Sequence, residues 1–294
     1  MSLPLRLPTG LAVETTIAGC RAVRAAARAS GQRIALVPTM GALHAGHAAL
    51  IDRARALADW TVVSVFVNPT QFGPGEDLAG YPRDLEGDGA LAAAHGADLL
   101  FAPSAREMYP SPPLTRVTMR GVTDRFEGEA RPGHFDGVLT VVAKLLHIVQ
   151  PDVAVFGQKD AQQAAAVRLL LGALDFPVVL EVAPTVREAD GLACSSRNAY
   201  LTAAERPQAA GLYRALARAA ELAASGEVDP AELVQAMRST LAASPALEVE
   251  YAAVVNGVTF EPLTALDPGA LAIVAARIGR TRLIDNLPLT PHGG

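Results

Sequence analysis

Short apolar runs bounded by proline, glycine or aspartate alternate with helical patterns through the first 184 residues of the chain. The runs that we predict as strands are residues 34–37, 62–67, 98–101, 153–156 and 178–182. The helices that we predict between them are residues 17–29, 47–58, 85–95, 138–149 and 161–174. Such alternation is typical of βαβ units, whose strands form a largely parallel sheet covered by helices. It therefore predicts a three-layer α/β domain.

The pattern changes after Pro184. Two long alanine-rich helical patterns, residues 203–224 and 230–243, precede β-rich runs at 249–255, 271–276 and 281–285. No βαβ alternation is visible there, and a chain of this length is long enough for two domains. We predict a Rossmann-like parallel-sheet domain over residues 1–184 and a smaller α+β domain over residues 185–294.

Composition excludes several classes of protein. Half of the 294 residues are hydrophobic, which provides material for a core, and the net charge of −5 disfavours binding to nucleic acid. The two cysteines, Cys20 and Cys194, form no C-x-x-C pair, so neither a disulfide framework nor a thiolate zinc site is indicated. The first residues of the sequence lack the apolar core that a signal peptide needs, and no apolar run approaches the about 20 residues of a membrane span. We expect a cytoplasmic protein that binds neither nucleic acid nor membranes.

The most informative segment is LVPTMGALHAGH, residues 36–47. It predicts a buried strand, a turn, and two histidines at the start of a helix. A helix that begins near Leu43 places His44 and His47 on one face, close to the positive end of the helix dipole. Imidazoles in that position can donate hydrogen bonds to phosphate oxygens, so the segment predicts a phosphate site.

Two other interpretations of this histidine pair stay open. A lone H-x-x-H pair is more often an exposed helix face than a functional one. A zinc site needs at least a third ligand, and no motif supplies it. The position directly after a strand, with Gly41 and Gly46 leaving room for a nucleotide against the backbone, favours the phosphate site.

A strand followed by H-x-G-H at a helix start resembles the nucleotidyltransferase superfamily that includes class I aminoacyl-tRNA synthetases. Within it, the chain resembles the pantothenate synthetase (pantoate–β-alanine ligase) family. The resemblance covers the chain in order through FVNPTQF (66–72), YPRD (81–84), RPGHFDGVLTVVAKL (131–145), FGQKDAQQ (156–163), PTVREADGLACSSRNAYL (184–201) and TRLIDN (281–286).

The resemblance implies a specific reaction. Pantoate and β-alanine would be condensed to pantothenate at the expense of ATP, through an enzyme-bound pantoyl adenylate, with release of AMP and pyrophosphate. The first domain would bind ATP and pantoate, and the second would cover the site. The resemblance also implies a homodimer.

The resemblance assigns roles to individual residues. The catalytic donors would be His44, His47, Lys159, Ser195, Ser196 and Arg197. ATP would be bound by Pro38, Thr39, Met40, Gly46, Gly157, Asp160 and Val186, and pantoate by Gln71, Gln163, Asn68, Met40 and Tyr81. Taken singly, each of these polar residues is more often an ordinary surface group. Only the matched motifs justify the assignments.

The chain departs from the family pattern at two positions. Gln158 stands where we expect a glutamate, and Gly87 stands where we expect the second acid of a pair that includes Asp88. ATP chemistry needs Mg²⁺, which prefers oxygen ligands, so Asp88 is the predicted metal ligand, with Glu86 or Asp84 as substitutes.

The second reaction step needs a site that excludes water, because the acyl adenylate must meet an amine first. We predict that the glycine-containing loop of residues 73–80 covers the site. Two rival functions remain: an adenylyltransferase that stops after the first step, and a nucleotide-binding module without catalysis. An adenylyltransferase would not need a second domain. The non-catalytic binding module is supported only by the departures from the family pattern at Gly87 and Gln158.

Overall fold

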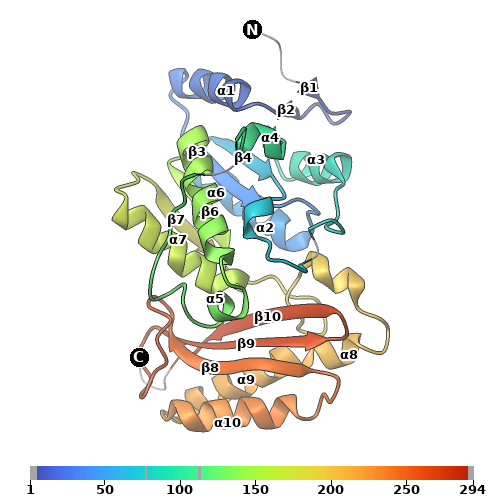
Figure 1. The fold of residues 1–294 in the computed structure, drawn as a ribbon, viewed down its shortest axis with the longest axis vertical. Coiled ribbons are helices and arrows are strands. Elements are labelled where there is room, and N and C mark those ends of the chain that lie inside the picture. The colour runs from blue at the N-terminus through green and yellow to red at the C-terminus, as the bar shows by residue number, and fades with distance from the viewer. Residues whose placement is uncertain (1–4, 77, 112–113, 291–294) are drawn as a thin grey trace. The chain divides into compact units, whose positions relative to one another are not determined.

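The computed structural model describes residues 5–76, 78–111 and 114–290, and its contacts divide them into two compact units (Figure 1). Unit 1 holds the residues up to 123 together with 127–157 and 166–183. Unit 2 holds residues 124–126 and 158–165 and the chain from 184 onward. The sequence assigns residues 124–126 and 158–165 to the first domain, whereas their contacts group them with unit 2.

Unit 1 is built on a seven-stranded sheet with the order β1-β2-β5-β4-β3-β6-β7. Its strands are β1 (Leu5–Arg6), β2 (Ala12–Glu14), β3 (Ile34–Thr39), β4 (Trp60–Val65), β5 (Leu99–Phe101), β6 (Val153–Gly157) and β7 (Val179–Ala183). Six strands are parallel, and β1 pairs antiparallel to β2. The first four residues of β3 are at most 1% exposed, as expected for a parallel strand covered on both faces.

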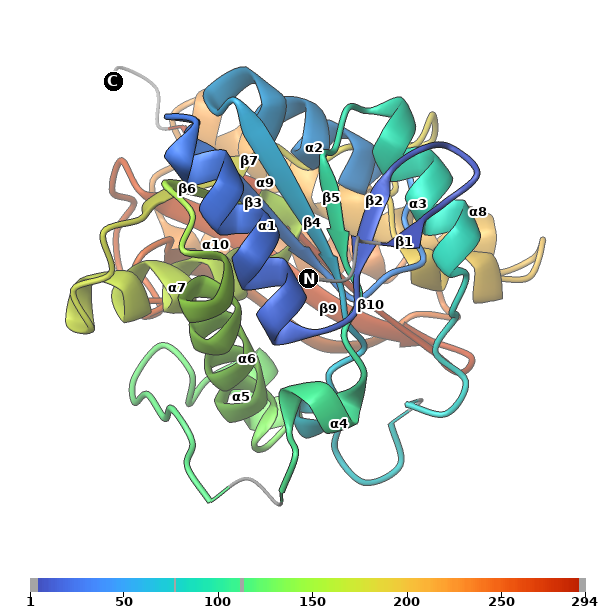
Figure 2. The ribbon, with the colours of Figure 1, turned by 90° about the horizontal axis from the view of Figure 1, so that it is seen from above.

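Helices cover both faces of this sheet. Figure 2 shows α1 (Ile17–Ala29) and α6 (His134–Val149) on one face and α2 (Ala45–Leu57) and α3 (Leu85–Ala94) on the other. The short helices α4 (Ala105–Met108), α5 (Glu127–Ala130) and η1 (Pro69–Gln71) and part of α7 (Ala161–Ala173) complete the unit.

The order of the strands fixes where loops gather in unit 1. From β3 the chain runs through β4 to β5 on one side of the sheet, and β6 and β7 lie on the other side of β3. This reversal is a topological switch point, and ligands of open α/β sheets bind outside the carboxyl ends of the strands that flank it. Thr39 ends β3 and Gly157 ends β6, so the H-x-G-H segment follows one of these strand ends directly.

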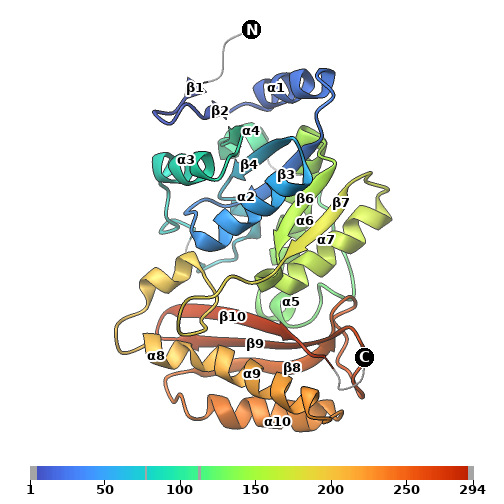
Figure 3. The same cartoon turned by 180° about the vertical axis from the view of Figure 1, so that it is seen from behind.

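Unit 2 packs two long helices on an antiparallel sheet of order β10-β9-β8 (Figure 3). The strands are β8 (Glu248–Asn256), β9 (Ala270–Ile278) and β10 (Thr281–Pro288), and the helices are α8 (Arg206–Ala209), α9 (Gly211–Ala224), α10 (Pro230–Leu241), η2 (Gln158–Asp160) and η3 (Ser196–Tyr200). Leucine and alanine side chains from α9, α10 and β9 form its core.

The predicted fold class is confirmed, with differences in local detail. Helix α2 begins at Ala45 rather than at residue 47, and α6 begins at His134 rather than at residue 138. Two glycines, at positions 133 and 137, make the start of α6 resemble a loop in the sequence. The predicted helix over 203–224 is divided into α8 and α9. The short elements β1, β2, α4 and α5 carry too little periodicity to be predicted. No helix of the described residues is long and apolar enough to cross a membrane.

Gly137 lets α6 approach η1 closely, which yields a prediction. A Cβ atom at this position would lie 2.4 Å from the carbonyl oxygen of Thr70 and 2.6 Å from Cα of Gln71. Because both are backbone atoms, we expect Gly137→Ala to lower the free energy of unfolding by about 1–3 kcal/mol. Gly172→Ala is the matched control: that helical glycine faces open space, so the change should stabilise by roughly 0.5–1 kcal/mol. Urea denaturation measures the free energy of unfolding of both variants. Equal changes in the two variants would contradict the close contact between Gly137 and η1.

Candidate active site

The turn after β3 is shaped by Gly41 and Asp88. Gly41 has φ of +90°, and a Cβ atom on it would lie 2.8 Å from Oδ2 of Asp88. That carboxylate is 3% exposed and accepts the backbone N–H groups of Ala42 at 3.1 Å and Leu43 at 2.7 Å. Burial raises the pKa of Asp88, and the two N–H groups partly offset this rise. Asp88 therefore holds the turn that leads into the histidine pair.

His44 and His47 cap the start of α2 reciprocally. His44 is the N-cap, and its Nδ1 accepts the N–H of Gly46 at 3.1 Å, while Nδ1 of His47 accepts the N–H of His44 at 3.3 Å. The two ring centroids are 4.2 Å apart. The expectation that both histidines lie within the helix is corrected, since His44 precedes it. In the neutral rings this bonding leaves the proton on Nε2, as a donor.

Asn68 organises a buried cluster next to this turn. Its Nδ2 donates to Oε1 of Gln71 at 3.0 Å and to the carbonyl of Gly137 at 3.1 Å. Its Oδ1 accepts the hydroxyls of Thr70 at 2.9 Å and Tyr109 at 3.0 Å. Asn68 is 1% exposed, so these bonds satisfy an amide that water cannot reach. The side chain of Gln71 is thus fixed from one end.

The other end of Gln71 meets a weak acceptor. Nε2 of Gln71 donates to Sδ of Met40 at 3.1 Å. A thioether is a poor acceptor, so this amide gains when an oxygen replaces the sulfur. Met40 also lines a cavity of about 290 Å³ together with Asp88, Arg83 and Ser104.

His134 was not predicted as part of the site, although it lies in the motif RPGHF. Its Nδ1 is 3.0 Å from the carbonyl oxygen of Gln71, and its Nε2 is 3.0 Å from Nη1 of Arg131. Arg131 in turn forms a bidentate ion pair with Glu76, at 2.6 and 2.7 Å. Burial and then the charge of Arg131 lower the pKa of His134 to about 4, so the ring is neutral and donates from Nδ1.

This chain of contacts reaches the loop predicted to cover the site. Burial alone raises the pKa of Glu76, but the hydrogen bond and charge of Arg131 outweigh it, and the pKa lies below its usual value. The loop is therefore tied at Glu76 to the segment before α6. Its role as a cover stays a prediction, and residue 77 of the loop lies outside the described residues.

Unit 2 carries the predicted groups that follow β6 and β7. Lys159 lies in η2, with Nζ 3.9 Å from Oδ2 of Asp160, which is a loose ion pair. Ser195 is the N-cap of η3, and its Oγ accepts the N–H of Arg197 at 3.3 Å. The carbonyl of Val186 accepts the N–H of Cys194 at 2.9 Å, which folds this segment back on itself.

The predicted residues are thus divided between the units. Unit 1 holds Pro38, Thr39, Met40, His44, Gly46, His47, Asn68, Gln71, Tyr81, Asp88 and Gly157. Unit 2 holds Lys159, Asp160, Gln163, Val186, Ser195, Ser196 and Arg197. Within unit 1 the structure joins Met40, Gln71 and Asn68 through hydrogen bonds, and it pairs the two histidines.

The predicted metal ligand Asp88 already carries two hydrogen bonds. Both carboxylate oxygens of Asp88 already accept backbone N–H groups, and Asp84 caps α3 by accepting the N–H of Gly87 at 2.9 Å. Among the described residues no group of three or more histidine, cysteine, aspartate or glutamate side chains is placed to hold a metal ion. Asp88 as a magnesium ligand stays a prediction, because each of its carboxylate oxygens keeps a second lone pair.

Comparison with known proteins gives one consistent result. The model of the family described as Pantoate-beta-alanine ligase matches residues 12–288. The pantothenate synthetase of Acidothermus cellulolyticus is 53% identical over 281 residues, covering 94% of this chain and 91% of that protein. That of Moorella thermoacetica is 50% identical, covering 93% and 97%.

Solved structures agree with this result. The crystal structure of pantothenate synthetase from Thermus thermophilus is 49% identical, with a TM-score of 0.90, covering 95% of this chain and 99% of that one. The pantoate-beta-alanine ligase from Francisella tularensis, complexed with beta-gamma ATP and beta-alanine, is 34% identical, with a TM-score of 0.79, covering 95% and 97%.

The lowered pKa of His134 predicts how stability depends on pH. The unfolded chain takes up a proton at this residue below pH about 6.5, whereas the folded chain does so only near pH 4. Stability contributed by the neutral ring is present above pH 6.5 and is lost as the pH falls toward 4, by up to about 3 kcal/mol. His134→Gln removes the titration, so the stability difference between wild type and variant should shrink between pH 7 and pH 4.5. A difference independent of pH in urea denaturation would contradict this assignment.

Proposed function

The chain belongs to the pantoate–β-alanine ligase family, and we propose that it forms pantothenate through a pantoyl adenylate, with release of AMP and pyrophosphate. The observation that carries the proposal is the H-x-G-H turn at the carboxyl end of β3, within a chain that matches the family from residue 12 to residue 288. ATP is a substrate in this reaction. The homodimer and the cytoplasmic location remain predictions.

In the first step an oxygen of the pantoate carboxylate bonds to the α-phosphorus of ATP, and the bond to the bridging oxygen of pyrophosphate breaks. Negative charge builds up on phosphate oxygens, which fixed donors stabilise. We assign this role to the Nε2–H groups of His44 and His47, at the N-terminus of a 13-residue helix whose dipole adds to the effect.

Further donors to the triphosphate come from unit 2 in this proposal. Lys159 provides a compact cation, and Arg197 provides a planar guanidinium suited to two phosphate oxygens. The hydroxyls of Ser195 and Ser196 add donors, while Asp160 accepts hydrogen bonds from the ribose. The backbone at Pro38, Thr39, Gly46, Gly157 and Val186 makes room for the nucleotide.

Pantoate is held by amides rather than by charges. Nε2 of Gln71 donates to the sulfur of Met40, so a pantoate oxygen is a better partner for it. Asn68 keeps Gln71 in place, and Gln163 and Tyr81 are assigned to the same substrate by resemblance. Neutral donors bind the carboxylate without pairing it so tightly that it ceases to be a nucleophile.

In the second step the neutral amine of β-alanine bonds to the acyl carbon of the adenylate. The bond from this carbon to the phosphate oxygen breaks, AMP leaves, and the nitrogen loses a proton as the amide forms. Mg²⁺ would accompany ATP and offset the charge of its phosphate oxygens. The two hydrogen bonds of Asp88 favour a role in bracing the turn over a role as metal ligand.

The proposal is tested by exchange of labelled pyrophosphate into ATP without β-alanine. We expect exchange that depends strictly on pantoate, and equal amounts of AMP and pantothenate once β-alanine is added. His47→Asn should lower the exchange rate roughly 10²- to 10³-fold by removing a donor. His147→Gln, at an exposed position of α6, is the control and should leave the rate unchanged. Exchange without pantoate, or formation of ADP, would refute the proposal.

Asp88 can be tested as a brace for the turn rather than a metal ligand. Asp88→Asn leaves one acceptor for two backbone N–H groups, so we expect kcat/KM to fall roughly 10- to 100-fold. The Mg²⁺ concentration that gives half-maximal rate should stay the same. Glu232→Gln, an exposed acid in the first turn of α10, is the control and should change neither quantity. A raised Mg²⁺ requirement in Asp88→Asn alone would support the metal assignment.

A further inference from the structure

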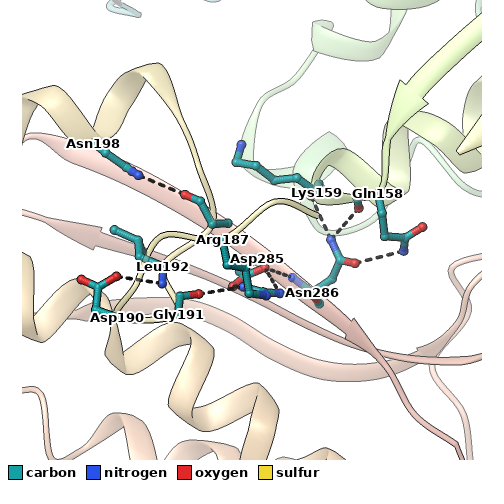
Figure 4. A network of polar contacts seen from close by, with 10 residues as sticks. Gln158, Lys159, Arg187, Asp190, Gly191, Leu192, Asn198, Asp285 and Asn286 are labelled. Carbon is teal, nitrogen blue, oxygen red and sulfur yellow. Dashed lines mark hydrogen bonds and ion pairs between the residues drawn. The ribbon is translucent and has the colours of Figure 1, made fainter. Parts of the chain in front are cut away.

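Asn286 connects strand β10 to the turn that carries Lys159 (Figure 4). Its side chain is buried, and the residue is 3% exposed. Nδ2 of Asn286 donates to the carbonyl oxygens of Gln158 and Lys159, both at 2.9 Å, and Oδ1 accepts from Nε2 of Gln158 at 3.0 Å. One amide thus makes three hydrogen bonds to two consecutive residues of η2.

The partners fix the orientation of this amide. Two backbone carbonyls accept and never donate, so the nitrogen of Asn286 must face them. The oxygen then faces the side chain of residue 158 and needs a donor there. The amide of Gln158 supplies that donor.

A second set of contacts holds Asn286 itself. The carboxylate of Asp285 accepts Nη1 of Arg187 at 2.6 Å, Nη2 at 3.1 Å, and the N–H of Asn286 at 2.8 Å. Arg187 also donates to the carbonyls of Asn286 at 3.1 Å and Gly191 at 3.0 Å. The network therefore includes the hairpin-like turn after Arg187, which precedes Ser195 in the chain.

We propose that Asn286 is a positioning residue for Lys159. Asn286 sets the backbone of η2 and so the starting point of the Lys159 side chain, which is 19% exposed. This inference rests on the proposed function, in which Lys159 binds the ATP phosphates.

The competing explanation is that Asn286 only stabilises unit 2. Asn256 is a suitable comparison, because it lies in β8 of the same unit and also bonds a loop through both amide atoms. Its Nδ2 donates to Asp267 at 2.9 Å, and its Oδ1 accepts the N–H groups of Val258 at 2.9 Å and Thr259 at 3.0 Å. Loss of either asparagine side chain should weaken folding, but of the two only Asn286 bonds to η2.

The test compares Asn286→Ala, Asn286→Asp and Asn256→Ala by steady-state kinetics and urea denaturation of the full chain. Both Asn286 variants lose the two donors to the carbonyls of Gln158 and Lys159. We expect them to raise the KM for ATP about tenfold, with the KM for pantoate within about twofold of wild type, since the loss of one or two hydrogen bonds corresponds to such a factor. Asn256→Ala should lower the denaturation midpoint and leave both KM values unchanged.

The role through Lys159 is tested by a double variant. In a Lys159→Met background, Asn286→Ala should add less than about a twofold further rise in the KM for ATP, because the group that it positions is gone. Asn286→Asp keeps the size of the side chain, so it keeps the test decisive if Asn286→Ala does not fold. An unchanged KM for ATP in Asn286→Asp, or full additivity with Lys159→Met, overturns the inference. Wild-type protein without pantoate-dependent exchange would instead overturn the proposed function.

Discussion

The geometry of the candidate site in unit 1 depends on one buried carboxylate meeting one glycine turn. Gly41 takes up a positive φ, and the space that a side chain would need is filled by Asp88. The turn leaves the part-buried backbone N–H groups of Ala42 and Leu43 in need of acceptors. A buried N–H group without an acceptor costs about 1–3 kcal/mol. Because Asp88 accepts both, the chain can leave β3 and enter α2 within a few residues. The reciprocal caps of His44 and His47 follow from that entry point.

Each unit uses a buried asparagine to hold a loop that carries predicted ligand-binding groups. In unit 1, Asn68 fixes Gln71 and the carbonyl of Gly137, and in unit 2, Asn286 fixes the backbone of Gln158 and Lys159. A primary amide suits this task because it offers two donors and two acceptor lone pairs on a short, neutral side chain. It can satisfy backbone groups of several residues without adding a charge that would compete for phosphate or carboxylate. The positions of the predicted ligand-binding groups Gln71 and Lys159 thus depend on these two asparagines.

Charge near Gln71 is arranged so that the neutral form of His134 is favoured. Arg131 lies between Glu76 and the imidazole, so its positive charge is balanced on one side and opposes protonation on the other. A neutral ring with a fixed tautomer donates to the carbonyl of Gln71 and keeps that backbone in place. The chain belongs to the pantoate–β-alanine ligase family. Selective binding of an acid and a triphosphate requires donors held in fixed positions, which a rigid backbone at Gln71 provides for its side chain.

The sequence by itself determined the parallel sheet, the change of architecture after Pro184, and the strand–turn–helix that carries His44 and His47, because periodicity and capping depend on residues close together in the chain. It could not predict β1 or β2, which are too short to show a pattern, nor the start of α6, where glycines conceal a helix. Only the tertiary structure decided that Asp88 braces the turn, and that Asn286 holds the turn of Lys159, because these partners are separated by about 45 and 127 residues. Hydrogen bonds over such distances follow from how strands and helices pack, and no local pattern encodes them.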